Sequence, residues 1–202
     1  DGPPEVSRAA IAAIESGVNQ YPPVMGLPDL RLAIAEHQQR FWNQSFDPDR
    51  DIVVTAGATE AIAAALLALC ETGDDVIVFD PTYDSYAAGI AMAGARMRSV
   101  LLHPPDVEHI GFWFDPDELR RAFGPRTRAV LLNTPHNPTG KVFDADELTL
   151  ISELCVQHDV LAIADEVYEH LVFDDHRHRP LATFPGMADR TITIGGYSKT
   201  FS

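Results

Sequence analysis

The chain has 202 residues and a formal net charge of −15. A charge of this size and sign argues against nucleic acid or an anionic membrane as the main partner, because both attract a positive protein surface. The content of 46% hydrophobic and 22% charged residues is typical of a soluble globular protein. No apolar run approaches the roughly 20 residues needed to span a bilayer, so a cytoplasmic protein is the default expectation.

Two helices are predicted in the first 44 residues, which we expect to form a segment of their own. The run EVSRAAIAAIESG (5–17) follows two prolines and ends in glycine, the usual signals for the start and stop of a helix. Residues 18–26 are rich in proline and predict an extended, turn-rich segment. The run LPDLRLAIAEHQQRFW (27–42) again has a proline in its first turn, with apolar residues at helical spacing.

Residues 45–202 show a different pattern and are predicted to form an α/β domain. Short aliphatic runs predict strands at 52–55, 76–79, 95–102, 128–133, 160–164 and 191–194. Helical patterns lie between most of these runs, at 59–73, 83–94, 115–123 and 144–159. Strands that are apolar throughout and separated by helices indicate a mostly parallel sheet with helices on both faces.

Polar residues follow five of the predicted strands. The sequences after these strands are AGATE, DPTYDSY, TPHNPTG, DEVY and GGYSK. In open parallel sheets, ligands bind beyond the carboxyl ends of the strands. The sequence therefore predicts one ligand site, built from a small-residue turn, an aromatic ring, an asparagine, an acid–tyrosine pair and a lysine.

Lysine is rare in this chain, which contains only Lys141 and Lys199. Lys199 lies in a turn rich in glycine and serine after an apolar run, where it is either a surface residue or an amine placed for covalent chemistry. Lys141 has no such company, so we expect it to be structural or at the rim of the site. Both histidines in the run 176–178 are expected to be exposed.

Six motifs resemble the signatures of one enzyme family, in the order in which that family carries them. They are NQYPPVMGLPDLRLAIAEH, TAGATEAI, DPTYDSY, HNPTG, ADEVYEHLVF and YSKTFS. The family is that of the fold-type-I pyridoxal-phosphate enzymes, and the motifs look most like class I/II aminotransferases of the kynurenine, glutamine and N-succinyldiaminopimelate branch. The resemblance implies pyridoxal 5′-phosphate as cofactor, no metal, and a homodimer in which residues 1–44 contribute to the dimer and the active site.

The resemblance also implies roles for four residues around the cofactor ring. Lys199 would form the Schiff base and then carry the proton between substrate and cofactor. Asp165 would face the pyridine nitrogen and keep it protonated, while Glu166 beside it would point away. Tyr168 and Asn137 would bond the phenolic oxygen of the cofactor. The alternative for Asp165 is a helix N-cap that follows a strand.

Three further tyrosines lie in the motifs given above. Tyr83 falls where the family places an aromatic ring over the cofactor, although a core tyrosine is the alternative. Tyr86, one helical turn later, is expected to contribute packing. Tyr21 resembles the tyrosine that reaches the cofactor phosphate from the neighbouring subunit, and local packing in its own loop is the alternative reading.

The cofactor phosphate is expected at the start of a helix. Gly57, Ala58 and Thr59 open the helix after the first predicted strand, where backbone amides and the positive helix end bind anions. Much of the family has a serine where this chain has Gly196, so the phosphate is expected to depend on backbone groups or on Ser198.

The implied reaction is transfer of an amino group from an amino acid to a 2-oxo acid. Two alternatives stay open at this point: a carbon–sulfur β-lyase on the same scaffold, and a non-catalytic domain of a transcription regulator. A dinucleotide-binding domain is excluded because no G-x-G-x-x-G follows the first predicted strand. Family members continue after SKTFS, so the domain is expected to be incomplete at its C-terminus and residues 1–202 alone to be poorly active.

Overall fold

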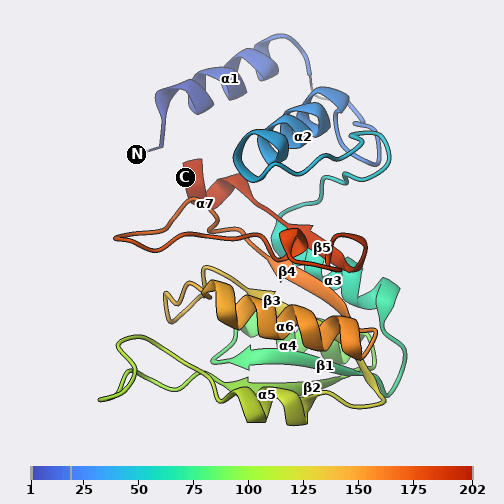
Figure 1. Cartoon of the computed structure of the whole chain (residues 1–202). Coiled ribbons are helices and arrows are strands. Elements are labelled where there is room, and N and C mark those ends of the chain that lie inside the picture. The colour runs from blue at the N-terminus through green and yellow to red at the C-terminus, as the bar shows by residue number, and fades with distance from the viewer. Residues whose placement is uncertain (1, 19, 202) are drawn as a thin grey trace. The chain divides into compact units, whose positions relative to one another are not determined.

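The computed structural model describes residues 2–18 and 20–201. Contacts divide the chain into two compact units, one of residues 1–57 with 196–202 and the other of residues 58–195. Figure 1 labels the elements of both units. The division after residue 44 that the sequence suggests stays a prediction.

The first unit contains three helices in its described residues. They are α1 (Pro4–Glu15), α2 (Pro28–Trp42) and α7 (Tyr197–Phe201). Both of the longer helices begin at a proline, as predicted. The buried side chain of Arg31 on α2 bonds the Gly26 carbonyl oxygen, at 3.3 Å, and the Asp49 carboxylate, at 3.0 Å. One guanidinium therefore fastens two turns of this unit to α2.

The strand predicted at residues 52–55 is wrong. These residues are extended, but among the residues that the structure describes they pair with no strand. Their backbone contact with another segment is the bond from Val54 N to Met25 O, 3.1 Å long. Gly26 permits this approach, because a Cβ atom there would lie 2.5 Å from a Val54 methyl group and its φ is +96°. An apolar run shows that a segment is buried or extended, whereas a strand also needs a partner.

The second unit is built on a parallel sheet. Its strands are β1 (Asp75–Asp80), β2 (Arg96–Leu101), β3 (Thr127–Asn133), β4 (Leu161–Asp165) and β5 (Thr191–Ile194), in the order β2-β1-β3-β4-β5. All four neighbouring pairs run parallel. Its helices are α3 (Ala58–Leu69), α4 (Asp84–Met92), α5 (Pro116–Ala122), α6 (Ala145–Gln157) and the short 3₁₀ turns Leu181–Thr183 and Ala188–Arg190. The predicted parallel α/β architecture is confirmed.

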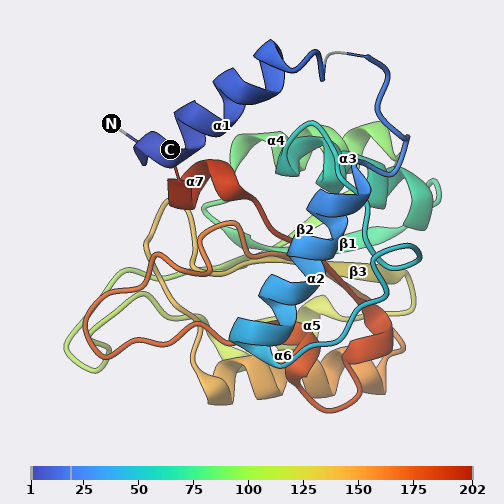
Figure 2. The same cartoon turned by 90° about the horizontal axis from the view of Figure 1, so that it is seen from above.

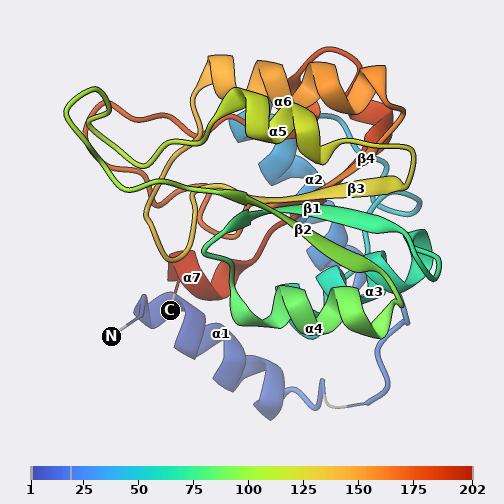
Figure 3. The same ribbon diagram turned by 90° about the horizontal axis from the view of Figure 1, so that it is seen from below.

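Helices cover both faces of this sheet, as Figures 2 and 3 show. Side chains of β1 and β3 alternate between two hydrophobic clusters, as the pleat of a strand requires. Ile77 and Val130 pack with residues of α5 and α6, whereas Val76 and Leu131 pack with residues of α3 and α4. Cys70 and Cys155 are both free thiols and are buried.

The carboxyl ends of the central strands lie level with one another. Asn133 at the end of β3 is in register with Asp165 at the end of β4, and Asp165 is in register with Ile194 at the end of β5. The polar residues that follow these strands therefore start from a common edge of the sheet. Among the described residues, no helix is both long and apolar enough to cross a lipid bilayer.

Candidate functional site

Asp165 is the centre of the polar group at this edge. It is the last residue of β4, and only 5% of its surface is exposed. Its carboxylate accepts a hydrogen bond from the hydroxyl of Tyr86 and a longer one from the backbone N–H of Val167, at 3.4 Å. A buried carboxylate needs such donors to remain charged.

Tyr86 takes a larger part than the sequence predicted. Tyr86 packs in the hydrophobic cluster around α3 and α4, as expected, and its hydroxyl also donates to Asp165. Burial, and then the Asp165 carboxylate, raise the pKa of Tyr86 well above its usual range, so that the phenol keeps its proton and acts as the donor. Nothing in the local sequence pointed to this bond, since the two residues are 79 positions apart.

Asn133 and Asn137 form a second bonded group at the same edge. The amide nitrogen of the Asn133 side chain donates to the backbone carbonyl of Asp165 at 2.9 Å. The side-chain oxygen of Asn133 accepts from the backbone N–H of Asn137 at 2.7 Å. Asn133 is buried, and it therefore ties the loop that carries Asn137 directly to the end of β4. In the sequence, Asn133 is recognisable only as the end of an apolar strand, so this role could not be predicted.

Tyr83 and Tyr168 lie close to Tyr86. The Tyr83 and Tyr86 rings are arranged edge to face, with centroids 5.9 Å apart. Electrostatic interactions with Tyr168 and Tyr83 are minor causes of the raised pKa of Tyr86, after burial and Asp165. Tyr83 is 41% exposed and caps α4, so it is not the core tyrosine of the alternative reading.

Glu166 points away from Asp165, as expected. Its carboxylate lies 3.0 Å from His178 Nε2, and it also accepts the backbone N–H of Leu181 at 3.0 Å. The expectation that His178 is exposed is wrong, since its side chain is completely buried, whereas His176 is exposed. A polar local sequence suggested a surface loop, but the buried carboxylate of Glu166 brings the imidazole inside.

His136, in the TPHNPTG motif, is also buried. Its Nδ1 lies 2.9 Å from the Thr139 hydroxyl, and its backbone N–H donates to the carbonyl of Lys141. Burial lowers the pKa of His136 to about 4, although a backbone hydrogen bond at Phe79 opposes the change. The imidazole is therefore neutral at pH 7 and holds the loop before and after Asn137 in place.

Lys141 is a structural residue, as predicted. Its ammonium group donates to the carbonyl of Phe112 and pairs with Glu147, both at 2.7 Å, and its side chain is only 9% exposed. It also lies over the ring of Phe143, 5.1 Å from the ring centre. An amine held by these contacts has no freedom to form a bond elsewhere.

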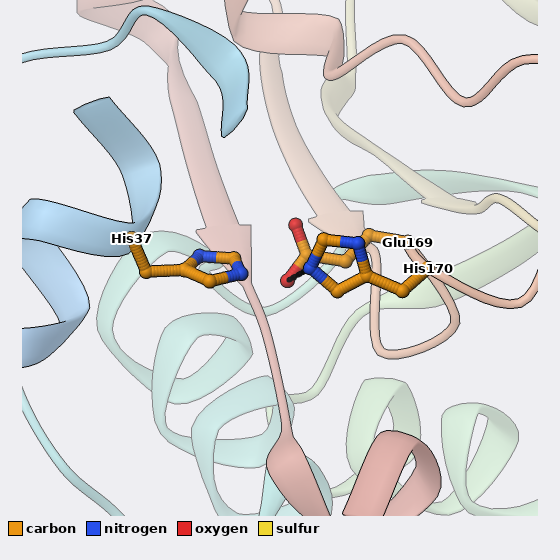
Figure 4. Close-up of side chains that lie close together, drawn as sticks. All are labelled: His37, Glu169 and His170. Carbon is orange, nitrogen blue, oxygen red and sulfur yellow. Dashed lines mark ion pairs between the residues drawn. The ribbon is translucent and has the colours of Figure 1, made fainter. Parts of the chain in front are cut away.

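The turn after β4 carries one further polar pair, Glu169 and His170. Their side chains lie beside each other, with Glu169 Oε1 4.0 Å from His170 Nε2 (Figure 4). His37, drawn in the same picture, belongs to α2 of the first unit, where its ring lies 4.8 Å from that of Phe41. Burial, followed by the charge of His178, lowers the pKa of His170.

The predicted phosphate-binding residues flank the start of α3. Ala58 is the first residue of this helix, which packs against β4 and β5, and Thr59 follows with an exposed side chain. Gly57, the last residue of the first unit's long segment, has φ +86°, a value that side-chain-bearing residues rarely adopt. The helix therefore begins with small residues and an abrupt change of chain direction.

The remaining predicted site residues belong to the first unit. Ser198 and Lys199 lie on α7, and both are exposed. Tyr21 is 98% exposed, so the alternative in which it packs locally is excluded. A site that combines these residues with Asp165 stays a prediction.

A family model for aminotransferase class I and II matches residues 1–202. The chain belongs to this family. It is 53% identical, over 202 residues, to a probable N-succinyldiaminopimelate aminotransferase of Mycobacterium tuberculosis, covering 100% of this chain and 50% of that protein. It is 41% identical to human kynurenine–oxoglutarate transaminase 1, covering 99% of this chain and 50% of that protein.

Solved structures agree with this assignment. The structure of N-succinyldiaminopimelate aminotransferase from Mycobacterium tuberculosis matches with a TM-score of 0.95 and 54% identity, over 100% of this chain and 52% of that one. A methionine aminotransferase from Escherichia coli matches with a TM-score of 0.93 and 39% identity, over 100% of this chain and 51% of that one. The chain thus spans about half the length of the aminotransferases it matches.

Within this chain, the structure brings together part of the predicted site. Asp165, Asn137, Tyr83 and Tyr168 start from one edge of the sheet, with Tyr86 and Asn133 as unpredicted members of the group. The lysine of the YSKTFS motif belongs to the other unit. The motifs contain Asp165 and Asn137, but they did not predict the roles of Tyr86 and Asn133, which form hydrogen bonds with these two residues.

Proposed function

We propose that this chain is the cofactor-binding part of a pyridoxal-phosphate-dependent aminotransferase, which moves an amino group from an amino acid to a 2-oxo acid. The observation that carries the proposal is the buried Asp165 carboxylate at the edge of a parallel sheet, with its donor Tyr86 and the tethered Asn137 loop. Family membership supports the same reaction class. The relatives named above are all aminotransferases or transaminases, which gives no support to a lyase or a regulator.

The residues present fit the cofactor. A protonated pyridine nitrogen needs an anionic acceptor shielded from water, and Asp165 is a carboxylate with 5% exposure. The hydroxyl of Tyr86 and the backbone N–H of Val167 both donate to this carboxylate. The raised pKa of Tyr86 keeps the phenol protonated, so it acts as a hydrogen-bond donor to Asp165.

When bound, pyridoxal phosphate supplies an aldehyde that amines attack and a ring that accepts electrons from the substrate Cα. In this proposal Asp165 holds a proton at the ring nitrogen. Asn137 and Tyr168 donate hydrogen bonds to the phenolic oxygen, and the Tyr83 ring lies against the cofactor ring and fixes its plane. Each of these groups positions or polarises, and none of them forms a covalent bond.

Lys199 is the residue proposed to bond the cofactor and, once released, to move a proton at the substrate Cα. A lysine performs both tasks only as a neutral amine. The other lysine of the chain, Lys141, is fully engaged with Phe112 and Glu147. This leaves Lys199 as the nucleophile among the residues of this sequence.

The phosphate is proposed to bind at the start of α3, at Gly57, Ala58 and Thr59, with help from Ser198. The helix has 12 residues, and its first turn presents backbone amides and the positive end of the helix dipole. Tyr21 is proposed to reach the phosphate of a second copy of the chain in a homodimer. Its 98% exposure supports this, because a side chain that packs on nothing is available to a partner.

The test is reduction with borohydride followed by peptide mapping. The protein, expressed from its complete coding sequence, is incubated with pyridoxal phosphate, reduced and digested. We expect the reduced cofactor to be attached to the peptide that contains Lys199, and we expect this label to vanish in Lys199→Ala. The matched control is Lys141→Ala, in which the label should stay on Lys199.

Label on Lys141, or none in the wild-type protein, would contradict the proposal. The reaction class is then tested with an amino acid and 2-oxoglutarate. Formation of product only when the 2-oxo acid is present supports amino transfer. Release of pyruvate and ammonia from a cysteine conjugate without a 2-oxo acid would identify a β-lyase instead.

A further inference from the structure

The buried pair Glu166–His178 lies next to Asp165 and has no part in the proposed chemistry. Glu166 is 1% exposed, and the side chain of His178 is completely buried. Glu166 directly follows β4, and its backbone N–H donates to the Ile194 carbonyl of β5 at 2.8 Å. The backbone of this glutamate thus extends the sheet one residue beyond Asp165.

The carboxylate of Glu166 closes the connection from β4 to β5. One oxygen lies 3.0 Å from His178 Nε2, and the other accepts the Leu181 N–H at 3.0 Å. Both contacts come from the far part of the connection, 12 and 15 residues along the chain. The side chain of Glu166 therefore fixes the connection between β4 and β5 to the end of β4.

Asp165 and Glu166 are held from opposite faces of the sheet. Asp165 bonds Tyr86, which belongs to the hydrophobic cluster around α3 and α4. Glu166 bonds Leu181, which belongs to the cluster around α5 and α6. Because consecutive residues of a strand point to opposite faces, fixing one carboxylate limits how the other can rotate or slide.

The turn that carries Tyr168 begins at the same residue. The carbonyl of Glu166 accepts the Glu169 N–H at 2.9 Å, and the carbonyl of Tyr168 accepts the Leu171 N–H at 2.7 Å. The backbone of Glu166 therefore lies between Asp165 on the strand and Tyr168 in the turn. A shift at Glu166 would move both residues.

The energetics of such a pair favour a positioning role over a stabilising one. Burying two charged or polar partners costs desolvation energy, and an apolar pair of similar volume is often as stable. A buried pair of this kind instead favours one geometry, because each oxygen of the Glu166 carboxylate is engaged with its own partner, His178 or Leu181.

We propose that the Glu166–His178 pair is a positioning device that sets where Asp165 and Tyr168 stand relative to a bound cofactor. The proposal rests on the proposed function, since it needs pyridoxal phosphate as the ligand of these two residues. Glu166 and His178 touch neither cofactor nor substrate in this view. They act through the strand end and the turn.

The test measures cofactor binding in the protein expressed from its complete coding sequence. The cofactor-free protein is titrated with pyridoxal phosphate, and visible absorption and circular dichroism report the Kd and the asymmetry of the bound ring. We expect Glu166→Ala and His178→Ala to raise the Kd by about 10- to 100-fold, as for residues that orient metal ligands from behind. His178→Gln, which keeps a donor for Glu166, should recover part of the loss.

The matched control is Ile151→Ala, a buried residue of α6 away from the strand end. It should lower the thermal midpoint yet leave the Kd and the dichroism of the bound cofactor unchanged. If the alanine variants of Glu166 and His178 bind cofactor like the wild type while losing only thermal stability, the pair is merely structural and the proposal is wrong.

A second measurement covers variants that fail to fold. In the wild-type protein, the backbone amides of Glu166 and Leu181 should exchange with solvent as slowly as those of β4. Exchange as fast as in the exposed residues 174–177 would show that the closure does not form, which overturns the proposal. Failure of the wild-type protein to bind pyridoxal phosphate would instead contradict the proposed function, and the exchange result would still decide whether the closure exists.

Discussion

At the scale of single residues, the site depends on groups whose protonation is fixed by burial. Tyr86 stays a neutral phenol beside Asp165, and His136 stays a neutral imidazole beside the Asn137 loop. Both residues shape the surroundings of the proposed cofactor contacts. Each effect has a measurable consequence.

Tyr86→Phe should destabilise the protein without disturbing its packing. The change removes the hydroxyl that donates to the buried Asp165 carboxylate, and hydrogen bonds to charged groups contribute about 1.5–3 kcal/mol. Urea unfolding of the cofactor-free protein measures the loss. Tyr83→Phe is the control, because this variant keeps the ring and the Tyr83 hydroxyl has no described role; an equal loss in both variants would contradict the assignment.

The buried imidazole of His136 should make the stability of the protein depend on pH. Its pKa is about 4 in the folded protein and near 6.5 in an unfolded chain, so the unfolded state binds more protons between these values. Stability therefore falls as the pH drops from 6.5 towards 4, by about 2 kcal/mol at pH 4.5. Urea unfolding at pH 7 and pH 4.5 measures this loss.

The loss should shrink in His136→Asn, which removes the titrating group but keeps an amide near Thr139. The control is His176→Asn, since His176 is exposed. An unchanged pH dependence in the His136 variant would show that another group causes it.

At the scale of elements, the ends of β3 and β4 act as one structure because Asn133 joins them. Asn133→Ala should cost about 1–3 kcal/mol of unfolding free energy, because the partly buried Asn137 N–H loses its described acceptor and the buried Asp165 carbonyl loses a donor. Ser152→Ala is the matched control, since the buried Ser152 hydroxyl donates only to a carbonyl of its own helix. Chemical unfolding compares the two, and equal small losses would show that the Asn133 bridge is unimportant.

The elements themselves could largely be predicted from the sequence. Proline and glycine signals placed α1 and α2, and aliphatic runs placed β1 to β5, because these patterns reflect local chemistry and burial. Residues 52–55 show the limit of the method: an aliphatic run was visible, but its lack of a neighbouring strand was not. Strand formation depends on a partner distant in sequence.

The candidate site could be predicted only in part, for a related reason. Asp165, Asn137 and Tyr83 stand in recognisable motifs. Tyr86 and His178 acquire their roles through contacts with Asp165 and Glu166, which no local pattern encodes. His178 looked like a surface residue because its sequence neighbours are polar.

At the scale of the whole molecule, the first unit leaves much apolar surface uncovered. The helix α1, all of whose residues are described, has no buried side chain, and Ile14 and Val24 are 73% and 95% exposed. Exposed apolar groups gathered in one segment are typical of an interface. This observation agrees with the proposed homodimer.

A complementation experiment tests whether Tyr21 acts across that dimer. Tyr21→Ala and Lys199→Ala subunits, each expected to be nearly inactive alone, are unfolded, mixed and refolded. A hybrid dimer contains one site in which both residues are intact, so activity should reappear in the mixture. If Tyr21 acted in its own subunit, each site of the hybrid dimer would lack either Tyr21 or Lys199, and the mixture would stay inactive.

The alternation along β4 has a consequence for how this protein can change. Asp165, its last residue, and Glu166, the next residue, direct their carboxylates to opposite faces of the sheet, and the two side chains differ in length by one methylene. Deletion of one residue from the strand would move each carboxylate to the other face of the sheet. The longer Glu166 side chain would then crowd Tyr86, and the shorter Asp165 side chain would not reach His178 and Leu181. The length of this strand is therefore constrained more tightly than its composition, and homologous chains should vary here by substitution and not by insertion or deletion.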